Sequence, residues 1–415
     1  MIRRNISFRV LEALATILLG IIQLSLLAHS FLADIVGTWA LVLTLLFFVG
    51  ALGSNWGIVM VAARNVAQGA DVRFSLGLAI WTQVVVAAVM LVALSLAVAN
   101  ISYFNPVRWP LVMLGTAILL SSIPQSSELL LIARKQMGQV CAAKIAGMLV
   151  TTLFVFVATL SAAGFSVAVV GLALSYFVTA GLTAWFARVL SYYPLPMPSR
   201  AEIIGLVREA LPLVVMSLVT WLYVRIDVVM IDHMLGKSAV AHYSAAYGFL
   251  DYLMLLSNAV MVALFPHFAE AATSNSGEFR RLYRKSLMLF ISYFFPLAAL
   301  VAGLASPILT LLYGGEYAVG ASSLAVLMIA AIFAWLNGPS GTILISLRRQ
   351  HVYMIGTCVS LFVNVVANII LIPRIGIIGA AWATALTEIA LCVFSLVIIY
   401  KQIGYLPFLC SVTRG

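Results

Sequence analysis

The stretch MSLVTWLYVRIDVVMIDHML (residues 216–235) is an apolar run that carries Arg225 and Asp227 near its middle. An ionised side chain at the centre of a membrane-spanning helix costs roughly 2.5–3.5 kcal/mol on insertion scales. Such a charge needs a partner, a water-filled cavity or a ligand. If this stretch crosses a bilayer, Arg225 and Asp227 therefore mark a candidate functional site, and other membrane segments should supply groups that face them.

The composition of the chain is that of a membrane protein. Hydrophobic residues make up 64% of the 415 positions and charged residues 9%, whereas a soluble domain has about 45–50% and about 25%. The net charge of +10 does not indicate nucleic-acid binding, because the basic residues lie in short gaps between apolar runs instead of clustering on one solvated face. The four cysteines and five histidines form no ligand spacing, so neither a metal nor another cofactor is predicted.

About 20 apolar residues are enough to cross a bilayer as a helix, and the sequence offers twelve such runs. The first run follows a basic flank, but it is long enough to span and many similar runs follow, so we expect a retained helix and not a cleaved signal peptide. The prediction is an all-α integral membrane protein with spans near 10–30, 36–58, 74–99, 109–132, 140–163, 166–188, 210–235, 240–265, 286–312, 319–346, 351–372 and 377–400.

The basic residues test this count, because cytoplasmic loops are rich in Lys and Arg. With twelve spans, nineteen of the 23 basic residues fall on one side: Arg3, Arg4, Arg9, Arg64, Arg73, Arg134, Lys135, Lys144, Arg188, Arg200, Arg208, Arg280, Arg281, Arg284, Lys285, Arg348, Arg349, Lys401 and Arg414. The other side has only Arg108, Lys237 and Arg374, which leaves Arg225 as the one basic residue assigned to neither a loop nor a helix end. Both termini are therefore predicted to be cytoplasmic.

A faint internal repeat divides the chain into two halves. ADIVGTWALV (33–42) resembles KSAVAHYSAA (237–246), and GFSVAVVGLALS (164–175) resembles GIIGAAWATALT (376–387). A proline-containing connection lies between the sixth and seventh spans. We therefore predict two six-helix lobes, residues 1–195 and 196–415, related by a parallel pseudo-two-fold axis, with the substrate bound between them.

Asp251 is the candidate partner of Arg225. Counted from the turn between the seventh and eighth spans, both residues reach a comparable depth. Arg225 and Asp227 are two positions apart on one helix and should point to different faces. Two interpretations stay open: an Arg225–Asp251 ion pair that joins two helices, or a hydrated cavity in which the guanidinium meets an anionic diphosphate with a bidentate fork.

Four more polar residues lie inside predicted spans. Glu388 is a candidate proton or cation site, and Glu128 a second one, although a salt bridge from Glu128 to Arg134 or Lys135 is the simpler expectation. Asn364 and Asn368 are four positions apart and share a helix face, which fits either helix-to-helix hydrogen bonding or the wall of a polar cavity. No nucleotide-binding loop or hydrolase motif is present, so an ion gradient, the membrane potential or product removal would drive any active transport.

The second half resembles a known family. The residues that carry the resemblance are RIDVVMIDHMLGKSAVAHYSAAYGFLDYLMLL (225–256), FPHFAEA (265–271), LLYGGEYAVGASSLAVL (311–327) and NVVANIILIPRIGIIGAAWATALTE (364–388). Together they resemble the bacterial oligosaccharide-unit flippases of the polysaccharide transporter family, within the multidrug and polysaccharide exporter superfamily.

The resemblance implies a fold and an activity. The fold would be a V of two six-helix lobes around a central cavity. The activity would move polyprenyl-diphosphate-linked oligosaccharide units across the bacterial inner membrane for surface polysaccharides such as O-antigen, without catalysis. Substrate-binding residues would be Arg225, Asp227, Asp251, Asn364 and Asn368. Membrane lipids and other polysaccharide assembly proteins are the further expected partners.

Two other functions are compatible with parts of the sequence. A drug exporter coupled to sodium or protons has the same architecture. Such an exporter would have acidic residues in one lobe and a cavity poor in basic residues, and the presence of Arg225 argues against it. A membrane-bound sugar polymerase or ligase would need a catalytic platform on the outer face, whereas every predicted outer loop is short.

Overall fold

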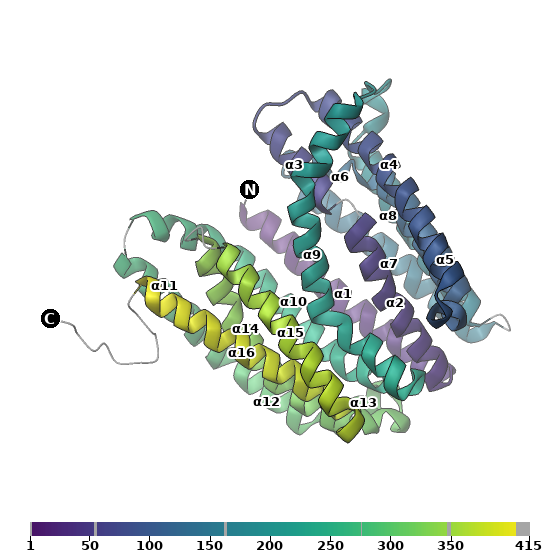
Figure 1. The fold of residues 1–415 in the computed structure, drawn as a ribbon, viewed down its shortest axis with the longest axis vertical. Coiled ribbons are helices and arrows are strands. Elements are labelled where there is room, and N and C mark those ends of the chain that lie inside the picture. The colour runs from purple at the N-terminus through teal and green to yellow at the C-terminus, as the bar shows by residue number, and fades with distance from the viewer. Residues whose placement is uncertain (1, 54–55, 162–163, 275, 347–349, 404–415) are drawn as a thin grey trace. The chain divides into compact units, whose positions relative to one another are not determined.

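The computed structural model describes residues 2–53, 56–161, 164–274, 276–346 and 350–403, and every regular element in these ranges is helical. The chain divides into two compact units, Met1–Trp221 and Leu222–Gly415. Helix α9 (Arg200–Leu235) begins in the first unit and ends in the second (Figure 1). The lobe boundary predicted between residues 195 and 196 lies in the segment before α9 and stays a prediction.

The first unit is built from long apolar helices with short connections. Helix α7 packs against α8 and α1, and α5 packs against α8 and α4. The elements are α1 (Ile2–Ser30), α2 (Ala33–Gly53), α3 (Trp56–Ala67), α4 (Val72–Asn100), η1 (Ser102–Val107), α5 (Arg108–Gln125), α6 (Glu128–Ala133), α7 (Met137–Leu160), α8 (Phe165–Phe186), η2 (Val189–Tyr192) and the first part of α9.

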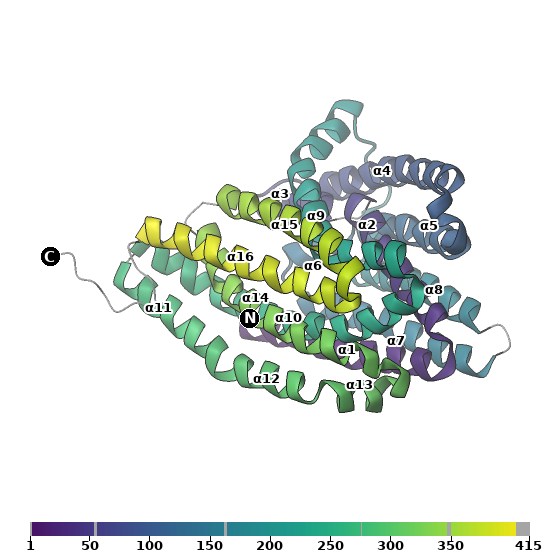
Figure 2. The same ribbon diagram turned by 60° about the horizontal axis from the view of Figure 1, so that its bottom comes forward.

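The second unit has a layer of three helices in which α16 packs against both α14 and α15, as Figure 2 shows. Helix α10 packs against α14. The elements after α9 are α10 (Lys237–Ser274), α11 (Ser276–Leu289), the π-helix η3 (Phe290–Phe294), α12 (Phe295–Gly303), α13 (Ala305–Tyr313), η4 (Gly315–Gly320), α14 (Ala321–Ser346), α15 (Gln350–Ile375) and α16 (Ile377–Ile403).

The protein is a multi-pass membrane protein. Within the described residues, eleven helical segments are long and apolar enough to cross a bilayer. They are Val10–Ser30, Ala33–Gly53, Val72–Asn100, Ser102–Gln125, Met137–Leu160, Phe165–Phe186, Arg200–Leu235, Arg280–Gly303, Gly315–Gly338, Met354–Ile375 and Ile377–Lys401. The predicted span 240–265 lies within α10, which is helical but is not among the eleven, so the count of twelve stays a prediction.

Two predicted spans are interrupted in the structure. The range 36–58 contains the end of α2 at Gly53 and the start of α3 at Trp56; residues 54–55 lie outside the described residues, so this range stays a prediction. The range 109–132 is divided between α5 and α6. Pro124, which has no N–H to donate to a helical carbonyl, lies at the end of α5. The range 286–312 contains the π-helix η3 and a further break at Leu304.

The predicted arrangement of basic residues falls partly outside the described chain. Arg348, Arg349 and Arg414 belong to the group of nineteen and lie outside the described residues. The side of the membrane on which each terminus lies therefore stays a prediction.

The repeated segments begin equivalent pieces of structure. The repeat at 164–175 starts α8 and the repeat at 376–387 starts α16, and each helix follows a glycine with positive φ, 40° at Gly164 and 65° at Gly376. Only glycine adopts such angles without strain. The other repeated pair likewise starts α2 and α10. The two units therefore share local construction at two matching points.

The turn between α15 and α16 yields a stability prediction. A Cβ on Gly379 would lie 2.4 Å from the carbonyl oxygen of Leu371, a backbone atom that cannot move without opening the hairpin. We expect Gly379→Ala to lower the free energy of unfolding by about 2 kcal/mol, measured as a lower melting temperature of the purified protein in detergent. Gly181→Ala on α8 is the matched control, because no atom lies within 4 Å of its added carbon; equal melting temperatures for the two variants would contradict the prediction.

Candidate functional site

The ion pair expected from the depth of Arg225 and Asp251 is confirmed. Helices α9 and α10 form a hairpin whose turn is the single residue Gly236, with φ 88°. Arg225 Nη2 lies 2.5 Å from Asp251 Oδ2 across this hairpin. Because the two charges neutralise one another, neither has to be solvated alone.

The pair is held in place but remains partly accessible. The Tyr247 ring lies under the guanidinium, with Arg225 Cζ 4.9 Å from the ring centroid. The Tyr247 hydroxyl donates to the Val224 carbonyl at 2.9 Å, which fixes the ring. The side chains of Arg225 and Asp251 are 15% and 32% exposed. Each side chain of the pair therefore keeps a small exposed surface.

Asp227 occupies a different and closed environment. It is only 2% exposed, and its carboxylate accepts hydrogen bonds from the Tyr243 hydroxyl at 2.5 Å and from the Val228 N–H at 2.8 Å. Tyr243 itself is fully buried. As expected for positions two apart on a helix, Asp227 and Arg225 face different partners, and the contacts of Asp227 fit a structural role better than contact with a substrate.

Glu388 joins three helices of the second unit. Its carboxylate accepts hydrogen bonds from the Tyr223 hydroxyl on α9 and from Asn337 Nδ2 on α14, the latter at 2.8 Å. Asn337 is buried and also donates to the Glu388 carbonyl at 3.2 Å. The predicted ion-coupling residue is thus a partly buried carboxylate that receives neutral donors.

Asn364 and Asn368 are both buried and bond to each other. Asn368 Nδ2 donates to Asn364 Oδ1 at 2.9 Å, and Asn364 Nδ2 donates to Thr387 Oγ1 on α16 at 3.4 Å. These contacts match the helix-to-helix interpretation of the pair. Their role toward a substrate stays a prediction.

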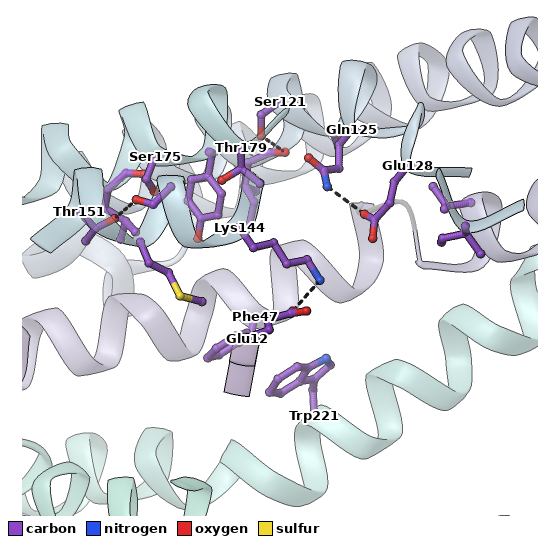
Figure 3. A pocket seen from close by; sticks show the side chains of 18 of the residues that line it. Glu12, Phe47, Ser121, Gln125, Glu128, Lys144, Thr151, Ser175, Thr179 and Trp221 are labelled. Atoms are coloured by element: carbon purple, nitrogen blue, oxygen red, sulfur yellow. Dashed lines mark hydrogen bonds and ion pairs between the residues drawn. The ribbon is translucent and has the colours of Figure 1, made fainter. Parts of the chain in front are cut away.

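The first unit contains a cavity of about 800 Å³. Figure 3 shows Lys144 pointing toward Glu12, and Gln125 toward Glu128, within its lining. Lys144 Nζ lies 3.1 Å from Glu12 Oε1, an ion pair between α7 and α1. The lining residues are Glu12, Gln23, Phe47, Val59, Met60, Ile118, Ser121, Ser122, Gln125, Glu128, Ile132, Lys144, Gly147, Met148, Thr151, Leu172, Ser175, Tyr176, Thr179 and Trp221.

Glu128 lies in this cavity and not in the expected salt bridge. The break after Pro124 sets Gln125 and Glu128 on its two sides, and Gln125 Nε2 donates to Glu128 Oε2 at 2.9 Å. Arg134 instead donates to the Tyr192 hydroxyl. Among the ion pairs of the described residues, none joins Glu128 to Arg134 or Lys135, so that expectation is wrong.

The sequence interpretation missed Glu12 and Lys144. The charge pattern places Lys144 with the basic residues of one side, but it lies inside α7 and pairs with Glu12 inside α1. Arg225 is therefore not the one basic residue within a span. The position of Lys144 inside the predicted range 140–163 was the available signal, since a lysine at that point of a membrane helix calls for a partner.

Comparisons with known proteins agree on family and fold. A family model described as "Polysaccharide biosynthesis protein" matches residues 35–322. A Haloferax volcanii protein named as a probable low-salt glycan biosynthesis flippase, Agl15, is 28% identical over 222 residues, which cover 52% of this chain and 46% of that protein. An uncharacterized membrane protein of Methanocaldococcus jannaschii is 26% identical over 189 residues, covering 43% of this chain and 36% of that protein. The matches thus span less than half the length of these curated relatives.

Solved structures share the fold at low sequence identity. An inward-facing multidrug resistance MATE family transporter of the MOP superfamily superposes with a TM-score of 0.78 at 13% identity, covering 96% of this chain and 98% of that one. The lipid II flippase MurJ, in an inward closed conformation, superposes with a TM-score of 0.77 at 12% identity, covering 95% of this chain and 89% of that one. These likenesses establish the architecture.

Proposed function

Because the chain belongs to the polysaccharide biosynthesis protein family, as the sequence resemblance predicts, we propose that it is a flippase for polyprenyl-diphosphate-linked oligosaccharides. It would carry these lipids from the cytoplasmic to the outer leaflet by alternating access between its two lobes, residues 1–195 and 196–415, without chemical conversion. The similarity to the Haloferax volcanii protein, named as a probable glycan biosynthesis flippase, supports this activity.

The observation that carries the proposal is the accessible ion pair between Arg225 and Asp251. A guanidinium donates two parallel hydrogen bonds to the oxygens of a diphosphate. An ionised carboxylate such as Asp251 has no hydrogen-bond donor and cannot bind the diphosphate in this way. In the structure Asp251 neutralises Arg225 at 2.5 Å. When substrate arrives, the diphosphate takes over the guanidinium and Asp251 turns toward water, so the buried charge is compensated in both states.

The cellular setting follows from the substrate. A bacterial inner membrane with both termini in the cytoplasm is the proposed location, since lipid-linked oligosaccharides are assembled where nucleotide sugars are available. Membrane lipids surround the chain, and proteins that consume the flipped unit on the outer face are candidate partners.

Deletion of the gene tests the proposal. In a strain that makes a surface polysaccharide, loss of the protein should cause lipid-linked oligosaccharides to accumulate on the inner leaflet and the surface polymer to disappear. Thin-layer chromatography of extracted lipids, with leaflet assignment by a membrane-impermeant periodate treatment, measures the accumulation, and gel electrophoresis of surface polysaccharide measures the polymer. A normal polymer with changed drug sensitivity alone would contradict the flippase proposal.

A cation-coupled drug exporter of the same fold is the second candidate, and the carboxylate of Glu388 is the observation that favours it. Glu388 accepts hydrogen bonds from Tyr223 and Asn337, an arrangement that can hold a proton or a cation. Such a carboxylate can also couple a flippase to an ion gradient. Glu388 therefore fits both candidate functions, and the two functions differ in the substrate that is transported.

We expect Glu388→Gln to lower gradient-driven transport at least about tenfold, because the amide cannot carry a proton between the two sides. Binding of lipid-linked substrate should be unchanged. Transport into proteoliposomes with and without an imposed proton or sodium gradient measures the effect, and Val393→Ala, at a 56% exposed side chain on the same helix, is a control. Equal gradient dependence in Glu388→Gln and in the unmodified protein would remove Glu388 from the coupling mechanism.

A further inference from the structure

The cavity of the first unit differs in chemistry from the Arg225 site. Among the residues that line it, the charged groups are Glu12, Glu128 and Lys144. Lys144 is already neutralised by Glu12 at 3.1 Å. The lining therefore carries a net negative charge and has no guanidinium, so it is unsuited to a diphosphate, which is itself anionic.

The polar groups of the cavity suit a ligand rich in hydroxyl groups. Carboxylate, amide and hydroxyl side chains line it from several helices, among them Glu128, Gln125, Gln23, Thr151, Ser175 and Thr179. Carboxylates accept hydrogen bonds, amides both donate and accept, and hydroxyls do either. Vicinal hydroxyls of a sugar present the same alternation of donors and acceptors, whereas an acyl chain has no hydrogen-bonding groups.

An aromatic platform lies in the same lining. The rings of Phe47 on α2 and Trp221 on α9 stack nearly parallel, with centroids 4.3 Å apart and planes at 10° (Figure 3). The stack stiffens both rings, and an aromatic face is a favourable surface for the C–H face of a pyranose. The cavity volume, about 800 Å³, lies within the range of about 300–1,000 Å³ that accommodates drug-sized ligands, so a short oligosaccharide fits.

We propose that this cavity binds the saccharide part of the transported lipid, with sugar rings against Trp221 and hydroxyl groups on Glu128 and Gln125. The inference rests on the proposed flippase function. In it, the two parts of the substrate are bound by different units: the second unit binds the diphosphate through Arg225, and the first unit binds the glycan. Selectivity among glycans would then reside in the first unit.

Binding of two tritiated lipids to the protein in detergent, measured by scintillation proximity, tests the proposal. One lipid is bare polyprenyl diphosphate and the other is the host's polyprenyl-diphosphate oligosaccharide. The glycosylated lipid should bind about tenfold more tightly than the bare one. Trp221→Ala and the isosteric Glu128→Gln should abolish that difference and leave the affinity for the bare lipid unchanged.

Two variants separate this site from others. Phe156→Ala on α7, at a 49% exposed ring that does not line the cavity, should retain the full difference. Arg225→Ala should weaken binding of both lipids by the same factor. Loss of the difference in Phe156→Ala as well as in the cavity variants would show a general effect on folding and would overturn the inference.

The outcomes also distinguish the inference from the function on which it rests. If the unmodified protein binds both lipids equally well, the glycan site is refuted while the flippase proposal stands. If it binds neither lipid, the proposed function fails and the inference with it. If Trp221→Ala and Glu128→Gln instead abolish binding of tritiated tetraphenylphosphonium and leave the lipids unaffected, the cavity is a site for organic cations and the inference is wrong.

Discussion

Replacing Arg225 with alanine is expected to lower transport of the lipid-linked substrate by about a hundredfold, which is the loss anticipated for one partner of a close charge pair. The guanidinium is the group proposed to bind diphosphate, and alanine offers neither charge nor donor. The variant leaves Asp251, whose side chain is 32% exposed, without this partner, so less protein should insert, because an uncompensated charge in a membrane span is costly. Fluorescent lipid-linked oligosaccharide flipped in proteoliposomes, normalised to the amount of inserted protein, gives the measurement.

Two further variants separate ligand binding from the joining of two helices. Arg225→Lys keeps the charge but not the bidentate fork, so transport should also be lost, although to a smaller extent. The double variant Arg225→Met/Asp251→Leu removes the ion pair without leaving a single charge, which often preserves stability. If that double variant transports normally, Arg225 serves only to hold α9 and α10 together and the diphosphate site is wrong.

Asp227→Ala is expected to lower the free energy of unfolding by about 3 kcal/mol, because a sealed carboxylate and its hydrogen bonds are lost together. Asp227 is 2% exposed, and its removal leaves the hydroxyl of the fully buried Tyr243 without this acceptor. The loss should appear as a lower melting temperature and a lower yield of folded protein. Affinity for polyprenyl diphosphate, counted per folded molecule, should stay at its normal value.

Tyr243→Phe is the matched control for this effect. It removes the hydroxyl that donates to Asp227 at 2.5 Å but leaves the Val228 N–H in place, so it should cost only about 1–2 kcal/mol. Variants of Arg225 and of Asp227, two positions apart on α9, can then be compared with each other. Loss of Arg225 should lower transport, whereas loss of Asp227 should lower stability. A variant of Asp227 that melts normally but has lost transport would reverse the assignment and place Asp227 at the substrate.

The architecture could be predicted from the sequence, because the length of an apolar run shows whether a helix can cross a membrane. The positions at which helices are interrupted could not be predicted in this way. An apolar window continues across Pro124, whereas the end of α5 depends on a missing backbone donor and a local turn that the window does not measure. The break after Pro124 matters most for function, because it brings Gln125 and Glu128 to the cavity.

The two ion pairs show why one site could be predicted and the other not. Arg225 and Asp251 belong to consecutive helices, so counting residues from the shared turn gives their relative depth. Glu12 and Lys144 are 132 positions apart, on α1 and α7, and no local pattern sets the register between those helices. Their pairing comes from the tertiary packing of the first unit, which a single sequence does not reveal.

The one-residue turn at Gly236 also bears on how the chain is made. Arg225 and Asp251 are 26 positions apart, so at about 5–20 residues per second the ribosome delivers the second charge about 1–5 s after the first. Each charge alone resists entry into lipid, by roughly 2.5–3.5 kcal/mol on insertion scales. We therefore expect the insertion machinery to hold α9 until α10 emerges, and the two helices to partition into the bilayer together with Arg225 and Asp251 paired.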